Sequence, residues 1–399
     1  MKTRATIFSI CALGLLLAGI AHAASYVMID DLALYDQAPA IAQVSVISVG
    51  SAPAQGVPSI DYIVLVERLL KGKISGSTVV VRVAGGVGPD GWGLELPGAP
   101  KFAEGDRAIL FLVPQRDGTY GILHLMLGAF HEFTSGGHHL ALRDLDDGVD
   151  LVRTAEGDEE VAMPRDFERF ADWLAAGAAT AGSYRVGVAP QRLERWQRAF
   201  AALRHDRNRL RWFDGGVEWH LARPAPAGAR RLLKDALRAW NPVAGSRLTY
   251  GGRTDADAGL GTFDGTNVVA FGDADQVIPG TFSCRHGGVA AVGGPWFDPE
   301  VTGKQHPGAG STAAIRILGA DIMVNDGADC LLSGLEGLAR ETLMHELGHT
   351  LGLGFSCGDS LNGRCDEAGQ RSVMRAVLRA DGATRTPGPS EHQRLDDGR

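Results

Sequence analysis

Between residues 24 and 150, hydrophobic positions come as short runs of β-branched and aliphatic residues that are broken by glycine-containing turns. Runs of this kind are typical of β-strands joined by tight turns. The clearest of them are residues 62–66, 79–83 and 108–113. Several short strands in succession predict a small sandwich or barrel. We therefore expect a small all-β domain over residues 24–150.

After residue 150 the hydrophobic period becomes helical. Phe167, Phe170 and Trp173 recur at helical spacing, and residues 191–207 carry a second apolar stripe. A stripe at this period is the pattern of an amphipathic helix. Residues 151–208 are therefore predicted to form a helical connector between two domains.

From residue 209 onwards, strand and helix patterns alternate. Residues 217–221 alternate as a strand does, and an apolar stripe over residues 233–240 predicts a helix. Further strands are expected at residues 248–250, 267–271 and 321–325. This order predicts an α+β domain with a mixed twisted sheet over residues 209–380.

The end of the chain has a different composition. Residues 381–399 are polar, rich in glycine, proline and charge, and show no apolar stripe. A segment that has so little apolar surface to bury is expected to be a disordered polar tail.

One helical pattern carries side chains that bind metals. His345 and His349 lie four residues apart and so share one face of a helix. Two neutral imidazoles at this spacing can bind one zinc ion at about 2.0–2.1 Å. Glu346 is placed to take a proton from a zinc-bound water, and Gly352 falls where the helix should end. The run predicts hydrolysis, most simply of a peptide bond; the alternative is an amphipathic helix with surface histidines.

These residues resemble the metzincin zinc peptidases, and among them the matrixin type. The family pattern is H-E-x-x-H-x-x-G-x-x-H followed by a methionine turn. Met374, in the sequence Ser-Val-Met-Arg, resembles the methionine of that turn. The resemblance covers residues 209–380 and implies an exported zinc-dependent endopeptidase, with Met374 as an apolar floor under the metal. Residues 287–299 resemble the edge strand beside the substrate cleft, which can pair with an extended peptide.

The chain departs from this pattern at the third metal ligand. The family has a histidine at position 355, where this chain has Phe355, and a phenyl ring cannot donate to zinc. A catalytic zinc site normally has three protein ligands. The nearby alternatives are Ser356, Cys357 and Asp359, of which Asp359 is a good ligand that lies four residues too late. A second hypothesis is therefore a catalytically degenerate relative that acts as a binding module.

The first residues predict export. Lys2 and Arg4 precede a largely apolar run over residues 6–20, and Ala21-His22-Ala23 is typical of a cleavage site. Residues 1–23 are therefore expected to be a signal peptide, and the protein to be secreted or periplasmic. No later apolar run has the length of a membrane span.

Cysteine usage agrees with export. Cys11 leaves with the signal peptide, and the four remaining cysteines favour two disulfides. Cys357 and Cys365 bracket a short loop, which leaves Cys284 with Cys330, although other pairings stay open. No cysteine lies between Cys11 and Cys284, so the N-terminal domain has no thiolate that could bind the zinc and inhibit the enzyme. Its role as prodomain, substrate-binding module or intramolecular inhibitor stays open.

The charge balance bears on partners. A net charge of −8 and a pI near 5.8 give no support for nucleic-acid binding, so the expected partner is a protein or peptide substrate. Calcium is a further candidate ligand, because two runs rich in aspartate, residues 255–257 and 326–329, offer oxygen donors. The alternative for both runs is a solvated turn. The sequence makes no prediction about oligomeric state.

Overall fold

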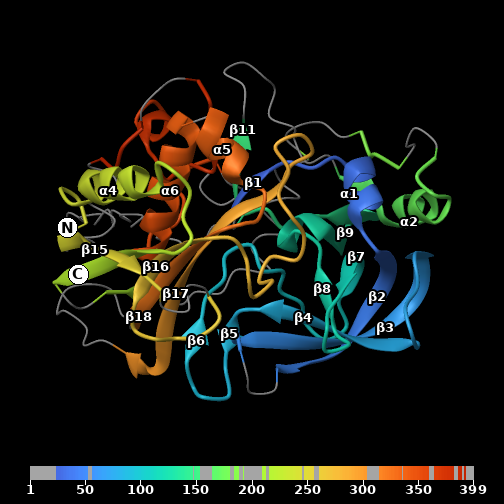
Figure 1. Cartoon of the computed structure of the whole chain (residues 1–399). Coiled ribbons are helices and arrows are strands. Elements are labelled where there is room, and N and C mark those ends of the chain that lie inside the picture. Colours follow the sequence, from blue (N-terminus) through green and yellow to red (C-terminus); the bar gives the residue numbers. More distant parts are fainter. Residues whose placement is uncertain are drawn as a thin grey trace, which may run out of the picture.

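The protein has a mixed α+β fold with two sheets and few helices (Figure 1). It is described here from a computed structural model. The residues described are 24–52, 56–146, 148–152, 164–179, 184–187, 192, 209–212, 215–244, 247–255, 260–302, 314–334, 336–358, 364–381, 385–388 and 391. The predicted signal peptide and almost all of the predicted helix at 191–207 lie outside these residues.

Five strands of the N-terminal part close into a barrel, as the strand pattern predicts. Closure occurs because β8 pairs with both β4 and β7. Alternate side chains point inwards, so that Val44, Val64 and Leu110 are buried in its core. The barrel strands are β2 (Ala40–Ser51), β3 (Ser59–Lys71), β4 (Thr78–Ala84), β7 (Arg107–Pro114) and β8 (Tyr120–Ile122).

Three further strands extend this sheet beyond β7, so that it has eight strands in all. They are β9 (Ala129–Ser135), β10 (His138–Leu142) and β12 (Arg165–Asp166), and two short helices lie against them, α1 (Asp31–Gln37) and η1 (Leu125–Gly128).

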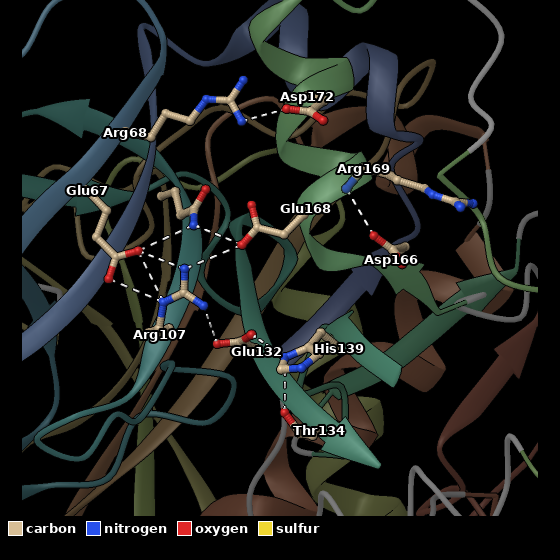
Figure 2. A network of polar contacts seen from close by, with 11 residues as sticks. Glu67, Arg68, Arg107, Glu132, Thr134, His139, Asp166, Glu168, Arg169 and Asp172 are labelled. Atoms are coloured by element: carbon tan, nitrogen blue, oxygen red, sulfur yellow. Dashed lines mark hydrogen bonds and ion pairs between the residues drawn. The ribbon is translucent and has the colours of Figure 1, made fainter. Parts of the chain in front are cut away.

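Helix α2 (Phe167–Ala175) is fixed to the barrel by both apolar and polar contacts. Its apolar face, which includes Phe167 and Phe170, is buried. On its polar side, Arg107 of β7 forms ion pairs with Glu67 at 2.8 Å and with Glu132 at 2.8 Å, and reaches Glu168 of the helix at 3.5 Å (Figure 2). The predicted connector helix is thus part of the barrel unit.

The second sheet has eleven strands, and its main path runs β15-β14-β16-β18-β17-β1-β11-β19. Strands β14, β15, β16 and β18 are parallel to one another, and β17 runs antiparallel to β18. The strands predicted between residues 217 and 325 all fall within this path. Its members are β1 (Ala24–Val27), β11 (Gly148–Val152), β14 (Gly216–Ala222), β15 (Arg247–Thr254), β16 (Asn267–Phe271), β17 (Gly288–Thr302), β18 (Ala314–Val324) and β19 (Val377–Arg379).

The elements beside this path are short strands and four helices. Helices α4 and α6 lie next to each other over the sheet (Figure 1). Their apolar stripes meet, since Leu233, Trp240 and Leu347 belong to one buried cluster. These elements are β5 (Gly86–Val87), β6 (Gly93–Leu94), β13 (Arg209–Arg211), α4 (Ala229–Trp240), α5 (Asp329–Gly334), α6 (Glu336–Thr350) and η2 (Gly369–Arg371).

Two strands from the N-terminal part belong to this second sheet and not to the barrel. β1 pairs antiparallel with β17 and parallel with β11, and β11 continues to β19. Figure 1 shows blue β1 beside orange β17, away from the blue strands of the barrel. The predicted division of the chain at residue 150 therefore falls inside a strand of the second sheet.

Both expected disulfides are confirmed. Cys284 is bonded to Cys330, and Cys357 is bonded to Cys365. The pair of bonds agrees with an exported protein. In the described part of the chain, no helix combines the length and the apolar character that crossing a membrane requires.

The C-terminal tail differs from its prediction in the residues that the structure describes. Arg385 is only 7% exposed, and it forms ion pairs with Glu341 of α6 at 3.1 Å and with Asp381. Glu391 is also buried and accepts a hydrogen bond from the Ser372 hydroxyl. The prediction of a disordered tail is wrong for these residues. It rested on the absence of an apolar stripe, whereas the tail is held by buried polar contacts of Arg385 and Glu391.

Candidate metal centre

The last two turns of α6 carry all three predicted site residues. His345, Glu346 and His349 are each 0% exposed. The helix is held in place by its backbone as well as by its apolar row: the indole Nε1 of Trp240 donates to the Met344 carbonyl at 2.7 Å, and that of Trp212 donates to the Thr350 carbonyl at 2.7 Å. The predicted alternative of surface histidines is therefore wrong.

Gly352 ends the helix as predicted. Its φ is +89°, in the left-handed region, and the Leu353 amide closes the helix by donating to the Gly348 carbonyl at 3.1 Å. A Cβ at position 352 would lie 2.3 Å from the Leu210 carbonyl oxygen. Position 352 thus requires glycine both for its backbone conformation and for the close approach of β13.

The two imidazoles converge through the same ring atom. Nε2 of His345 lies 2.7 Å from Nε2 of His349. Nδ1 of His345 lies 2.6 Å from the Val373 carbonyl oxygen, and Nδ1 of His349 lies 2.6 Å from that of Leu353. Because a carbonyl only accepts, each Nδ1 carries a proton, and in the neutral tautomer each Nε2 presents its lone pair to the other.

Electrostatics favour that neutral state. Burial lowers the pKa of His345 to about 4, so its ring is neutral near pH 7. Two lone pairs facing each other repel, and a shared cation removes the repulsion. Two tetrahedral zinc ligands at 2.0–2.1 Å have donor atoms about 3.3 Å apart, so the rings need to separate by only about 0.6 Å. His345 and His349 therefore fit zinc as two of its ligands.

Phe355 occupies the third position of the pattern. It is 4% exposed, and its ring centre lies 5.6 Å from that of each imidazole. Of the alternatives, Cys357 is bonded to Cys365, Ser356 is hydrogen-bonded to Ser372 and Met374, and Asp359 lies outside the described residues. Within the described ranges, no group of three or more His, Cys, Asp or Glu side chains could hold a metal ion.

Met374 lies directly against α6. A Cβ added at Gly348 would come within 2.3 Å of the Met374 sulfur, so the thioether packs on the helix at Gly348, between His345 and His349 in the sequence. The residue before it, Val373, supplies the carbonyl that fixes His345. Sequence reasoning found Met374 but missed the carbonyls of Val373 and Leu353. No sequence signal exists for them, because any residue carries a carbonyl.

The Glu346 carboxyl group lies against two strands of the sheet, β1 and β17. Its Oε1 accepts a hydrogen bond from the Ser25 hydroxyl of β1. A Cβ at Gly293 of β17 would lie 3.1 Å from its Oε2, which shows how closely that strand covers the carboxyl group. Burial raises the pKa of Glu346 to about 8, although hydrogen bonds from Ser25 and from the Gly293 backbone act to lower it. Ser25, which is 321 positions away in the chain, was not found by sequence reasoning.

The aspartate-rich runs do not form a calcium site among the residues that are described. Asp255 is paired with Arg223 at 2.8 Å, and Asp257 lies outside the described ranges. Asp326 accepts a long hydrogen bond from the Asp273 amide at 3.4 Å. Within the described residues, neither run belongs to a group of three or more side chains that could hold a metal ion.

Comparison with known proteins gives no relative: the chain matches no family model and no curated protein. The geometry around His345, Glu346 and His349 is therefore the observation that bears on function.

Proposed function

We propose that this protein is an exported zinc-dependent endopeptidase of the metzincin-like kind. The observation that carries the proposal is the convergence of the two Nε2 atoms, 2.7 Å apart, while both Nδ1 atoms are held by backbone carbonyls. Hydrogen bonds from the second ring nitrogen to a carbonyl fix the tautomer and direction of metal-binding imidazoles. The order of strand, helix, strands, zinc helix and Met374 also supports it.

The residues of the chain have separate roles in this proposal. His345 and His349 would hold the ion, which when bound lowers the pKa of a water molecule and polarises the substrate carbonyl. The Glu346 carboxylate would accept a proton from the attacking water and donate it to the leaving amine. The carbonyls of Val373 and Leu353 keep the imidazoles aligned. β17 is not the edge strand that the sequence predicts, because it is paired with both β18 and β1, so an extended peptide would pair with it only in place of β1.

A degenerate relative that binds peptides without cleaving them is the second candidate. It is favoured by Phe355, whose ring packs on both imidazoles where a third donor is expected. A site with fewer protein ligands binds zinc less tightly. The two candidates share the fold and differ only in turnover.

The test is zinc content and casein cleavage of the wild type and the Glu346→Gln variant, measured on the same zinc-loaded, disulfide-bonded preparations. Glutamine keeps the shape of the side chain but cannot accept the proton. We expect both proteins to hold stoichiometric zinc and only the wild type to cleave. Equal inertness of both with zinc bound supports the binding module, and failure of both to hold zinc rejects both candidates.

A further inference from the structure

The edge of β17 that could receive a peptide substrate is already paired with a strand of the same chain. β1 lies antiparallel to it, with Ala24 opposite Val292, Ser25 opposite Ala291 and Val27 opposite Gly288. This is the geometry by which an extended peptide adds to the edge of a sheet. The other side of β1 is paired with β11, so no free edge of β17 remains along these residues.

The same strand also contacts the proposed catalytic base. The Ser25 hydroxyl donates to Glu346, and both side chains are fully buried. While this bond is in place, one oxygen of the Glu346 carboxylate is directed at β1 and is not available to a water molecule. The strand therefore covers the peptide position and engages the base at once.

The segment that follows β1 is anchored on the barrel side of the molecule. Asp31, the first residue of α1, is 2% exposed and forms an ion pair with Arg165 at 2.6 Å. Arg143 lies 3.6 Å from the same carboxylate, and the Tyr184 hydroxyl donates to it at 3.0 Å. These bonds keep the pKa of Asp31 below its ordinary value against the opposing effect of burial. The barrel unit thus holds the end from which β1 extends.

We propose that Ala24–Val27 is an intramolecular inhibitor that occupies the place of an extended peptide on β17 and engages Glu346 through Ser25. This inference rests on the proposed peptidase function. Activation then requires displacement of β1. Its removal leaves two strand spacings, about 9.5 Å, between β17 and β11, which is the width that one extended peptide fills.

The experiment compares zinc-loaded chains that begin at Ala24 and at Met28. The first readout is the rate of casein hydrolysis. The second is fluorescence anisotropy of a labelled peptide with the sequence of residues 24–30, which reports on the strand position without any turnover. A second peptide with alanine in place of serine at the Ser25 position measures the contribution of the hydroxyl.

We expect removal of β1 to raise the rate of hydrolysis by about tenfold or more and to create a site that binds the labelled peptide. The added peptide should then inhibit hydrolysis. The serine-to-alanine peptide should bind about tenfold more weakly, since the hydrogen bond to the buried Glu346 carboxyl group is lost.

The outcomes separate this proposal from the function on which it rests. A shortened chain that cleaves casein no faster than the longer one and does not bind the peptide overturns the inhibitor and leaves the peptidase. A shortened chain that binds the peptide but never cleaves supports the strand position and rejects the peptidase.

Removing an internal strand could also prevent folding, so a point variant gives an independent test. Ser25→Ala in the chain that begins at Ala24 keeps the strand and removes only its bond to Glu346. We expect hydrolysis to rise several-fold, whereas Ser51→Ala, at an exposed position of β2, leaves the rate unchanged. An unchanged rate for Ser25→Ala would overturn the role given to the hydroxyl.

Discussion

Phe355 is the residue on which the strength of the proposed metal centre depends. Its ring packs against both imidazoles, and the described residues supply no third donor there. A buried aromatic ring at this place stabilises the histidine pair by contact while leaving the ion with fewer protein ligands. The chain should therefore bind zinc, but less tightly than a three-ligand site would.

Phe355→His should raise zinc affinity by about tenfold or more, because it adds a donor where the site lacks one. Competition with a chromophoric chelator at neutral pH measures the change. Phe355→Leu is the control, since it alters packing without adding a donor, and it should give no gain. An unchanged affinity for the histidine variant means that another residue already fills the third place.

Asp321 of β18 should make stability depend on pH. It is 5% exposed, and burial raises its pKa to about 8, above its ordinary value of 3.8. Between these two values the folded chain binds the proton that the unfolded chain has lost, so stability falls as pH rises. Asp321→Asn should reduce the loss of unfolding free energy between pH 5 and pH 8, measured by urea denaturation of metal-free protein.

The same variant should be less stable than the wild type at pH 5. The carboxyl group accepts hydrogen bonds from the Val268 amide and the Trp296 indole at 2.9 Å each, and an amide side chain can accept at only one of its two ends. A loss of about 1–3 kcal/mol is expected. An equally steep pH dependence in both proteins would contradict the assignment to Asp321.

At the scale of the element, α6 is fixed at its C-terminal end and at Glu341. The sequence predicts the first of these contacts and not the second. Its C-terminal end is set by Gly352, which could be predicted because glycine is the residue type that the left-handed turn requires. Its outer face is fixed by Glu341 and the tail residue Arg385, which could not be predicted, because a polar segment carries no periodic signal for the charge that it will meet.

Gly352→Ala should lower the unfolding free energy by more than the conformational cost of about 1–2 kcal/mol, because its Cβ also meets the Leu210 carbonyl. Gly105→Ala is a matched control: its φ is +88°, and a Cβ there meets nothing within 4 Å. Thermal unfolding of the two variants separates the cost of backbone strain from the cost of the steric clash with Leu210. Equal losses of unfolding free energy would show that the clash with β13 does not contribute.

Arg385→Met should destabilise the protein by about 3 kcal/mol or more, because it leaves Glu341, which is 1% exposed, without its cation. Arg371→Met removes an exposed partner of Glu367 and should change stability by less than about 0.5 kcal/mol. Chemical denaturation gives both values. A small effect of Arg385→Met would mean that the tail does not stabilise α6.

At the scale of the whole molecule, strands β1 and β11 from the N-terminal part join the sheet of the C-terminal part. The barrel strands, the order of the C-terminal strands and helices, and both disulfides could be predicted because each leaves a local pattern or a small set of pairings. The positions of β1 and β11 could not, because strand pairing joins residues far apart and strands of four or five residues have no distinctive pattern. For that reason the contact of Ser25 with Glu346 appears only in the structure.

X-ray absorption at the zinc edge, on dialysed and correctly oxidised protein at neutral pH, tests the central claim most directly. The account predicts stoichiometric zinc with imidazole nitrogens at about 2.0–2.1 Å, and loss of the ion in His345→Ala. A chain that retains no zinc, or zinc that has no imidazole ligand, would contradict it.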